Sequence, residues 1–310
     1  MVLMFPGQGS QYVGMGAGLR ELSEAARSVF AEAADVLGES LVEAILKGPE
    51  EVLRRSDTAQ PAILTTSVAA QKALSEHGIE PKAVAGHSLG EYSALVAAGS
   101  LSFRDALEAV AERGRLMAAA CDCIEGTMVA LLGDTTAFLD EILEEASQLG
   151  IAEIANRNSP GQIVLSGERE ALGRAAELGL ERGVKKVVWL RVAGPFHTSL
   201  MADAAKEFAR FISEIDIAAP RVTFVANVTG ESESSPETIR SLLVEQICST
   251  VQWEKSMRTL LAAAHDCFID TGPGKVLKGL MARIDRSARV YAADSPGFFD
   301  EVQSLVAGTA

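Results

Sequence analysis

Short apolar runs alternate with longer amphipathic stretches along much of this chain of 310 residues. In the N-terminal part, the pattern predicts strands over Val2–Phe5 and Ala83–Ala85 and helices over Ser23–Leu37 and Pro61–His77. The second helix has proline near its start and Gly78 just beyond its end, as helices often do. This alternation is typical of a parallel sheet whose strands are joined by helical crossovers.

The pattern changes after residue 123, where the predicted elements follow one another in the order βαββαβ. These elements are Thr127–Leu132, Thr135–Gln148, Ile151–Ala155, Gln162–Ser166, Arg169–Arg182 and Lys185–Val192. That order is the split βαβ unit of ferredoxin-like domains. We therefore predict a small ferredoxin-like domain over residues 124–193, inserted into a large α/β-hydrolase-like domain made of residues 1–123 and 194–310.

The α/β pattern resumes after the predicted small domain. Strands are expected at Val222–Ala226 and Cys267–Asp270, with an edge strand at Val290–Ala292. Helices are expected to contain Ser256–Ala264 and to span Lys275–Ile284. Two lobes of an α/β protein with a cleft between them are the architecture that this order predicts.

Ser88 lies in the pentapeptide Gly86-His87-Ser88-Leu89-Gly90, between a predicted strand and a helix-favouring run. A Gly-x-Ser-x-Gly sequence in this context is typical of a sharp turn that presents a nucleophilic serine. The glycines allow the turn to pack closely, and the helix start places backbone N–H groups beside the serine oxygen. The sequence therefore predicts an enzyme that forms an acyl-serine.

A serine hydroxyl needs a base to act as a nucleophile at neutral pH, and the chain has four histidines. His77 ends a predicted helix and His265 precedes a strand, so structural roles suffice for both. Because side chains of neighbouring residues point apart in a sharp turn, we expect His87 to pack beneath the turn. His197 lies on a loop between the predicted domains, a position that suits a base reaching into a cleft. No Asp or Glu stands out as the group that orients this base.

A predicted helix that begins at Ser102 places Arg113 in its apolar stripe. The stripe otherwise consists of Phe103, Ala106, Leu107, Val110, Gly114 and Met117, whereas another face carries Glu108, Glu112 and Arg115. An unpaired buried charge is very costly, so Arg113 should have a partner. One interpretation is a structural ion pair or a charge that reaches out to solvent. The other is the carboxylate of a substrate, bound through two guanidinium nitrogens.

Composition narrows the possible functions. A formal net charge of −14 argues against nonspecific binding to nucleic acids or acidic membranes. No apolar run reaches the ~18 residues that a membrane span requires. The N-terminal residues lack the basic stretch and cleavage site of a signal peptide, so we expect a cytoplasmic protein.

Four cysteines at irregular spacings do not make a disulfide scaffold. Neither Cys121-Asp122-Cys123 nor His265-Asp266-Cys267 has the spacing of a zinc site. We interpret the cysteines as reduced structural thiols, and we expect neither a metal nor a redox cofactor.

Six segments, in order along almost the whole chain, resemble the malonyl-CoA:acyl carrier protein transacylases of bacterial fatty-acid synthesis. They are Phe5-Pro6-Gly7-Gln8-Gly9-Ser10-Gln11, Gly86-His87-Ser88-Leu89-Gly90-Glu91-Tyr92-Ser93-Ala94-Leu95, Arg113, Pro195-Phe196-His197, Val251-Gln252-Trp253 and Gly272-Pro273-Gly274-Lys275-Val276-Leu277.

The resemblance implies a ping-pong reaction that uses a coenzyme A thioester as substrate and needs no cofactor. Ser88 would attack malonyl-CoA to give a malonyl-serine ester, which the thiol of acyl carrier protein then takes over. His197 would act as base and then as acid in each half of the reaction. The family orients this histidine through a backbone carbonyl, and the matching position implied here is Gln252.

The same resemblance implies roles in substrate binding. The backbone N–H groups of Gln8 and Leu89 would bind the oxyanion, and Arg113 would bind the malonyl carboxylate. Phe196 resembles the residue of malonyl-selective members, where a bulky side chain should crowd an α-methyl branch.

Basic residues offer two candidate docking surfaces for the acidic acyl carrier protein. Lys275, Lys278 and Arg283 share one broad face of a predicted helix, and Lys185 and Lys186 lie on the predicted small domain. For both groups an ordinary solvated surface is the alternative. We expect the enzyme to act as a monomer.

Three other functions compete with this one. A free-standing acyltransferase of a polyketide synthase would use the same chemistry, although a short chain without a carrier or synthase domain favours fatty-acid synthesis. A serine esterase or thioesterase is disfavoured by the missing acid and by the inward Arg113. A non-catalytic module that binds carrier protein is disfavoured because Ser88 and His197 are both present.

Overall fold

The computed structural model describes residues 1–295, 297 and 298, and its larger sheet is mainly parallel. The strands of this sheet lie in the order β10 (Arg289–Ala292), β9 (Cys267–Asp270), β1 (Val2–Phe5), β2 (Ala83–Gly86), β7 (Thr223–Val225) and β8 (Ser232–Glu233). All neighbouring pairs are parallel except β7 and β8. The predicted edge strand near Val290 is confirmed as β10, at one end of the sheet.

Both faces of the sheet are buried, which explains why its strands are apolar at successive positions. Within β1, Leu3 and Phe5 belong to one hydrophobic cluster and Val2 and Met4 to another, because successive side chains of a strand point to opposite faces. The first cluster includes residues of α2 (Glu24–Leu37), α3 (Glu39–Lys47), α4 (Glu50–Arg54), α5 (Ser56–Glu76), α6 (Gly90–Ala97), α7 (Phe103–Cys123), α10 (Ala202–Ile212) and α11 (Pro236–Glu245). The second is covered by α12 (Trp253–Ala262) and α13 (Val276–Ile284). The short α1 (Ala17–Leu22) packs beside α2 and α5.

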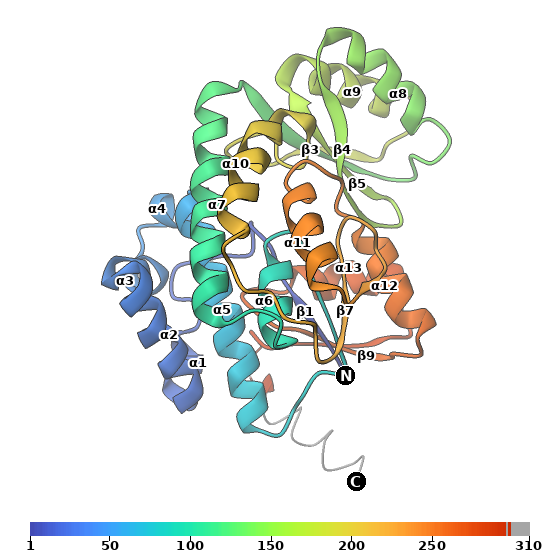
Figure 1. Ribbon diagram of the computed structural model, residues 1–310. Helices are drawn as coiled ribbons and strands as arrows, with labels where there is room; N and C mark the ends of the chain where they lie inside the picture. Colours follow the sequence, from blue (N-terminus) through green and yellow to red (C-terminus); the bar gives the residue numbers. More distant parts are fainter. Residues whose placement is uncertain (296, 299–310) are drawn as a thin grey trace.

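A second sheet of four antiparallel strands lies at the top of the molecule in Figure 1. Its strand order is β4 (Ala152–Ser159), β5 (Gln162–Glu168), β3 (Gly126–Leu132) and β6 (Lys186–Trp189). Two helices, α8 (Leu139–Ala146) and α9 (Arg169–Glu181), bury a separate apolar cluster against this sheet. The elements follow along the chain as β3, α8, β4, β5, α9 and β6, which is the order that the sequence predicted.

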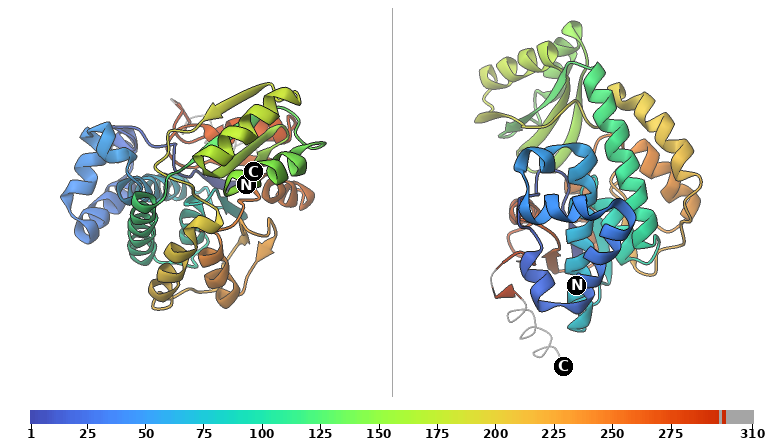
Figure 2. Two further views of the ribbon diagram at one scale, coloured as in Figure 1. Left: turned by 90° about the horizontal axis from the view of Figure 1, so that it is seen from above. Right: turned by 90° about the vertical axis from the view of Figure 1, so that its left-hand side faces the viewer.

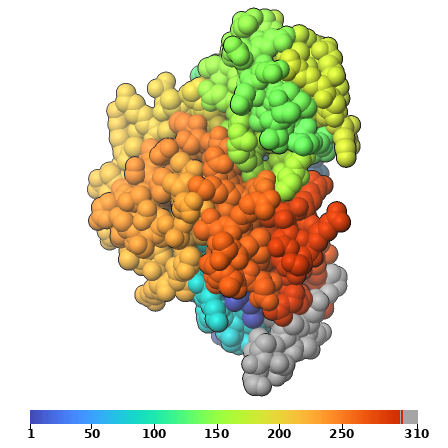
Figure 3. Space-filling model, turned by 90° about the vertical axis from the view of Figure 1, so that its right-hand side faces the viewer, coloured from blue at the N-terminus to red at the C-terminus, as the bar shows by residue number. Residues whose placement is uncertain are grey.

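The small sheet is fastened to the rest of the molecule through β4. The backbone N–H of Val251 donates to the carbonyl of Ala155 (2.8 Å), and that of Arg157 donates to the carbonyl of Val251 (3.0 Å). The views in Figure 2 show the small sheet beside the upper end of α7, and Figure 3 shows its surface resting on the segments that follow β7. This contact places residues of β4 close to the carboxyl edge of the parallel sheet.

Several predicted boundaries shift. The predicted helix Pro61–His77 begins earlier, at Ser56, so Pro61 lies inside α5 instead of at its start. Strand β4 continues to Ser159, four residues beyond its predicted end, because β5 pairs with it up to the turn at Pro160. Strand β6 is shorter than predicted, and the chain leaves the sheet after Trp189 to return to the parallel sheet.

Three further observations concern the described residues, 1–295, 297 and 298. Each helix there is too short or too polar to cross a membrane. The same residues contain no group of three or more His, Cys, Asp or Glu side chains that could hold a metal ion. The four cysteines, which all lie in this part, are free thiols.

Candidate active site

Ser88 lies at the carboxyl end of β2, in a sharp turn that leads directly into α6. Its φ angle is +52°, a left-handed conformation that is rare for a residue with a side chain and is frequent at functional sites. A Cβ atom on Gly86 would lie 1.9 Å from the carbonyl carbon of Gly90, and one on Gly90 would lie 2.0 Å from the carbonyl oxygen of Phe5. Only glycine fits at both positions. The strand, the sharp turn and the helix follow one another as predicted.

His197 meets Ser88 from the loop before α10, although 109 positions separate the two residues. The distance from Ser88 Oγ to His197 Nε2 is 2.8 Å, and His197 also has a left-handed backbone, with φ +62°. On the other side of the ring, Nδ1 lies 2.8 Å from the carbonyl oxygen of Gln246. A carbonyl can only accept, so Nδ1 carries the proton and Nε2 is free to accept the proton of the serine hydroxyl.

The surroundings of His197 keep its ring neutral. Burial is the main reason why its pKa falls to about 3, and the positive charge of Arg113 lowers it further. A neutral imidazole at physiological pH is the form that can act as a base. The geometry and the charge state of His197 are therefore both suited to general-base chemistry at Ser88.

The predicted role of Gln252 is wrong. Its carbonyl accepts hydrogen bonds from the backbone N–H and the hydroxyl of Ser256, in the first turn of α12, at 2.9 and 3.0 Å. The carbonyl that orients His197 belongs instead to Gln246, in the turn that ends α11. A backbone carbonyl does orient His197 in place of an acid. It belongs to a residue six positions before Gln252, and no local pattern in the sequence identifies that residue.

Arg113 extends from α7 towards Ser88 and is only 1% exposed. Its guanidinium donates to Oε1 of Gln60 (2.7 Å), to Oε1 of Gln246 (2.8 Å) and to Oγ of Ser88 (3.2 Å). All three acceptors are neutral, and Nε of Arg113 has no acceptor among the described residues. The Cζ atom of Arg113 lies 5.9 Å from the centroid of the Tyr92 ring. Among the described residues no carboxylate forms an ion pair with Arg113. Burial accordingly lowers the pKa of the guanidinium.

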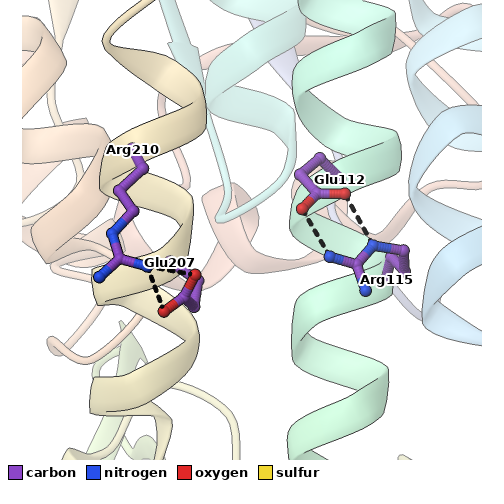
Figure 4. A network of polar contacts seen from close by, with 4 residues as sticks. All are labelled: Glu112, Arg115, Glu207 and Arg210. Atoms are coloured by element: carbon purple, nitrogen blue, oxygen red, sulfur yellow. Dashed lines mark hydrogen bonds and ion pairs between the residues drawn. The ribbon is translucent and has the colours of Figure 1, made fainter.

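The next arginine along the same helix has the opposite surroundings. Arg115 lies on the outer face of α7 and forms two hydrogen bonds of 2.7 Å with the carboxylate of Glu112 (Figure 4). A similar exposed pair, Glu207 with Arg210, lies on the neighbouring α10. The buried arginine is therefore the one without an anionic partner, which rules out a structural ion pair with a described residue.

A cavity of about 90 Å³ lies where these residues meet. Its walls include Ser88, His197 and Arg113, together with Gln8, Leu89 and Phe196. It shares Gln8 and other lining residues with a larger cleft of about 450 Å³ between the two sheets. The site thus consists of a small pocket beside the serine and a wider approach to it.

Comparison with known proteins agrees with this geometry. A family model described as acyl transferase domain matches residues 2–293. The chain belongs to the acyl transferase family. Malonyl CoA-acyl carrier protein transacylase from Bacillus subtilis is 41% identical over 297 residues, which cover 96% of this chain and 94% of the relative.

Solved structures of the family have the same fold. The crystal structure of acyl-carrier-protein-S-malonyltransferase from Bartonella henselae aligns with a TM-score of 0.94 and 39% identity over 99% of both chains. A malonyl-transacylase solved in complex with the acyl-carrier protein of a type II polyketide synthase aligns with a TM-score of 0.94 and 37% identity, over 98% of this chain and 99% of that one.

The first-turn residue Glu91 and the loop residue Asn227 also belong to this acyl transferase site, and the sequence analysis missed both. Asn227 follows β7 at the same edge of the sheet as Ser88, and its Oδ1 accepts the backbone N–H of Ser88 (2.6 Å). Glu91 is 1% exposed and accepts the backbone N–H of Asn227 (2.7 Å). The place of Asn227 directly after a parallel strand is the one sequence signal that points to it.

His87 packs as expected, away from the serine. Its Nε2 lies 2.8 Å from Oδ1 of Asn158 at the end of β4, and its ring lies against Trp253 with the centroids 5.5 Å apart. Burial lowers the pKa of this imidazole. His87 therefore joins the serine turn to the small sheet and is not placed to serve as the base.

The basic residues singled out from the sequence lie at the surface. Lys275 is exposed but precedes the first residue of α13, so the predicted helix Lys275–Ile284 starts one residue later. Lys278 is half-buried, and Arg283 is exposed and donates to Oε1 of Gln162 at 2.6 Å. Lys185 and Lys186 are exposed at the start of β6.

Proposed function

We propose that this acyl transferase moves the malonyl group from malonyl-CoA to the phosphopantetheine thiol of acyl carrier protein, as in fatty-acid synthesis. The observation that carries the proposal is the buried guanidinium of Arg113, which lies 3.2 Å from Ser88 and whose hydrogen-bond acceptors among the described residues are all neutral. An acyl group that bears a carboxylate supplies the missing anion. The names of the similar proteins from Bacillus subtilis and Bartonella henselae support this choice of acyl group and acceptor.

In the first half-reaction, Oγ of Ser88 attacks the thioester carbonyl while Nε2 of His197 takes the hydroxyl proton. The tetrahedral intermediate collapses, the carbon–sulfur bond breaks, and the sulfur of coenzyme A leaves with the proton from His197. The carbonyl of Gln246 stabilises the transient imidazolium through its hydrogen bond to Nδ1. The product is a malonyl ester of Ser88.

The second half-reaction reverses these steps with a new thiol. The phosphopantetheine thiol of acyl carrier protein gives its proton to His197 and attacks the ester carbonyl. The bond between the acyl carbon and Oγ of Ser88 breaks, and His197 returns the proton to the serine. No redox change occurs, and we propose that no cofactor takes part.

The oxyanion of both intermediates would lie between the backbone N–H groups of Leu89 and Gln8. Leu89 directly precedes the first residue of α6, where N–H groups have no partner within the helix. Gln8 lies on the loop after β1, and a Cβ on the adjacent Gly7 would come within 2.5 Å of the carbonyl oxygen of His87. Both residues line the small cavity beside Ser88, which supports this role.

Selectivity follows from Arg113 and Phe196. Acetyl would leave the guanidinium buried without an anion, and a site built around such a partner can reject the analogue that lacks it by roughly 10⁴-fold. Phe196 is 5% exposed and forms part of the cavity wall, and we propose that it crowds an α-methyl branch.

Further parts of the proposal concern architecture and partners. We propose a large α/β-hydrolase-like domain (1–123 and 194–310) with an inserted ferredoxin-like domain (124–193), acting as a monomer in the cytoplasm. Acyl carrier protein would dock on Lys275, Lys278 and Arg283 or on Lys185 and Lys186. The comparisons do not favour the alternative of a polyketide acyltransferase.

Intact-protein mass spectrometry tests the proposed function. The chain is mixed with malonyl-CoA or acetyl-CoA, and acyl carrier protein is then added. We expect a malonyl adduct on Ser88 that moves to the carrier. An adduct that decays only to free malonate would instead identify a thioesterase, and the absence of any adduct would identify a binding module.

A further inference from the structure

Glu91 occupies the first turn of α6, directly behind the serine turn, and is almost completely buried. Both of its carboxyl oxygens accept hydrogen bonds. Oε1 accepts the backbone N–H of Asn227 at 2.7 Å, and Oε2 accepts from Nε2 of Gln246. Burial raises the pKa of this carboxyl group well above its usual value, although the two hydrogen bonds and the charge of Arg113 act in the opposite direction. Glu91 therefore ties together two segments that lie on different loops.

The contact with Gln246 fixes the direction of that amide. Nε2 of Gln246 donates to Glu91 and also to the carbonyl of Ser88 (2.9 Å), both of which can serve it as acceptors. Oε1 must then face Arg113, whose Nη2 lies 2.8 Å away. The opposite orientation would point an NH₂ group at a guanidinium, and two donors would face each other.

Through its contact with Asn227, Glu91 also holds the position of Ser88. Oδ1 of Asn227 accepts the N–H of Ser88, and its Nδ2 donates to the carbonyl of Gly86 at 2.5 Å. These bonds hold the two sides of the turn that gives Ser88 its left-handed backbone. Glu91 anchors the backbone of Asn227, so it reaches Ser88 by this second route.

We propose that Glu91 is a positioning residue, which holds Gln246 and Asn227 and thereby places Arg113 and Ser88 for a carboxylated acyl group. This inference rests on the proposed function. A buried carboxyl group is costly to fold, and an apolar side chain of similar size would fill the same space at less cost. The hydrogen bonds to two residues of the site explain why a carboxyl group occupies this position.

The test is Glu91→Gln, which keeps the shape of the side chain but replaces one acceptor with a donor. The backbone N–H of Asn227 can only donate, so the remaining oxygen should stay with it and the new NH₂ group should face Nε2 of Gln246. We expect the single-turnover rate of Ser88 malonylation to fall about 100-fold, on the scale of one unsatisfied buried group. Because acetyl does not use Arg113, acetylation should fall less, and the malonyl-to-acetyl rate ratio should drop at least about tenfold.

Glu112→Gln is the matched control, since it removes a carboxylate from the outer face of α7. It should leave both rates within about twofold of wild type. A double variant of Glu91→Gln and Gln246→Ala should show a rate ratio no lower than Gln246→Ala alone, because Glu91 acts on Arg113 through Gln246. An unchanged ratio in Glu91→Gln, or effects on the ratio that multiply fully in the double variant, would overturn the proposal.

Two further comparisons keep the test decisive. If thermal unfolding shows that Glu91→Gln does not fold, Glu91→Asp is measured in the same way. The shorter side chain of aspartate cannot hold both partners, so the malonyl-to-acetyl rate ratio should again fall. An unchanged ratio in a folded Glu91→Asp would overturn the role. A wild-type chain that takes no malonyl group would refute the proposed function itself, whereas normal wild-type loading with an unaffected variant would refute only the role of Glu91.

Discussion

Two arginines on opposite faces of α7 have opposite surroundings. On the outer face, Arg115 is paired with Glu112 and both side chains contact water, 61% and 24% exposed. On the inner face, the described acceptors of Arg113 are amide and hydroxyl oxygens, and the buried carboxyl group of Glu91 lies beyond Gln246. An exposed pair contributes little to stability, because water solvates the charges equally well when they are apart. A buried and unpaired charge, in contrast, lowers stability and is retained only where something else depends on it.

In the proposed reaction, this difference makes the site complete only when its substrate is bound. The neutral partners of Arg113 orient the guanidinium without neutralising it, so that the substrate carboxylate would meet a preformed donor, as we propose. An arginine that already had a carboxylate, like Arg115, would have no such affinity. We propose that the inner face selects carboxylated acyl groups because Arg113 has no ion pair with a described residue.

The largest effect is expected from the nucleophile that the inner face serves. Ser88→Ala removes the only atom that carries the acyl group in the proposed reaction, so no adduct should form with malonyl-CoA. Intact-protein mass spectrometry measures this directly, with Ser93→Ala, in α6 just after the serine turn, as a variant that keeps Ser88. Persistent labelling of Ser88→Ala would show that another residue is the nucleophile.

A smaller effect is expected when the serine turn loses its support. Asn227→Ala removes the acceptor of the Ser88 N–H and the donor to Gly86. A buried group left without its partner costs about 1–3 kcal/mol, so the rate of malonylation should fall about 10–100-fold. Because the support does not involve Arg113, acetylation should fall by a similar factor. A selective loss of malonylation would contradict this assignment.

The pH dependence sharpens the contrast between the two faces. Burial and the unpaired Arg113 hold the pKa of His197 far below its usual value, at about 3, so the base stays neutral as the pH falls from 8 to 6. Protonation of His197 should change the malonylation rate less than about twofold over this range, whereas a histidine of ordinary pKa near 6.5 would lose most of its neutral form. Single-turnover rates in one buffer system measure the profile. A half-maximal rate near pH 6.5 would refute the neutral, depressed histidine.

The smallest effect is expected on the outer face. Arg115→Ala breaks the exposed pair with Glu112 and should leave both acylation rates unchanged, with a loss of less than about 1 kcal/mol in the free energy of unfolding. Chemical denaturation and the same rate assays check both expectations. A selective loss of malonylation would mean that the outer charges contribute to substrate selection.

The sequence was most informative where local chemistry decides the structure. The apolar strands, the glycines around Ser88 and the helical stripe that turns Arg113 inward are patterns within short segments, and the structure places these residues as expected. His197 followed from its position on a loop between predicted domains. These features single out Ser88 and His197, whereas the role of Arg113 beside them rests on the resemblance to malonyl-CoA:acyl carrier protein transacylases.

The orienting and supporting residues could not be found in this way. Gln246 lies at the end of a helix, and its backbone carbonyl is a group that every residue has, so neither its type nor its spacing reveals the bond to His197. The resemblance that implied Gln252 matched the wrong position, since every residue carries a backbone carbonyl. Gln60 and Glu91 act through tertiary contacts with residues 53 and 155 positions away. Such contacts depend on how helices pack, which periodicity alone does not determine.

The most direct test of the unpaired guanidinium is the ratio of malonyl to acetyl transfer in Arg113→Ala. Single-turnover acylation of Ser88 by malonyl-CoA and by acetyl-CoA would be measured for this variant and for the wild type. If Arg113 binds the substrate carboxylate, malonylation should fall by roughly 10³–10⁴ while acetylation falls far less, so that the ratio collapses. Equal losses with both substrates would show that Arg113 supports only the fold of the site, and would contradict the account.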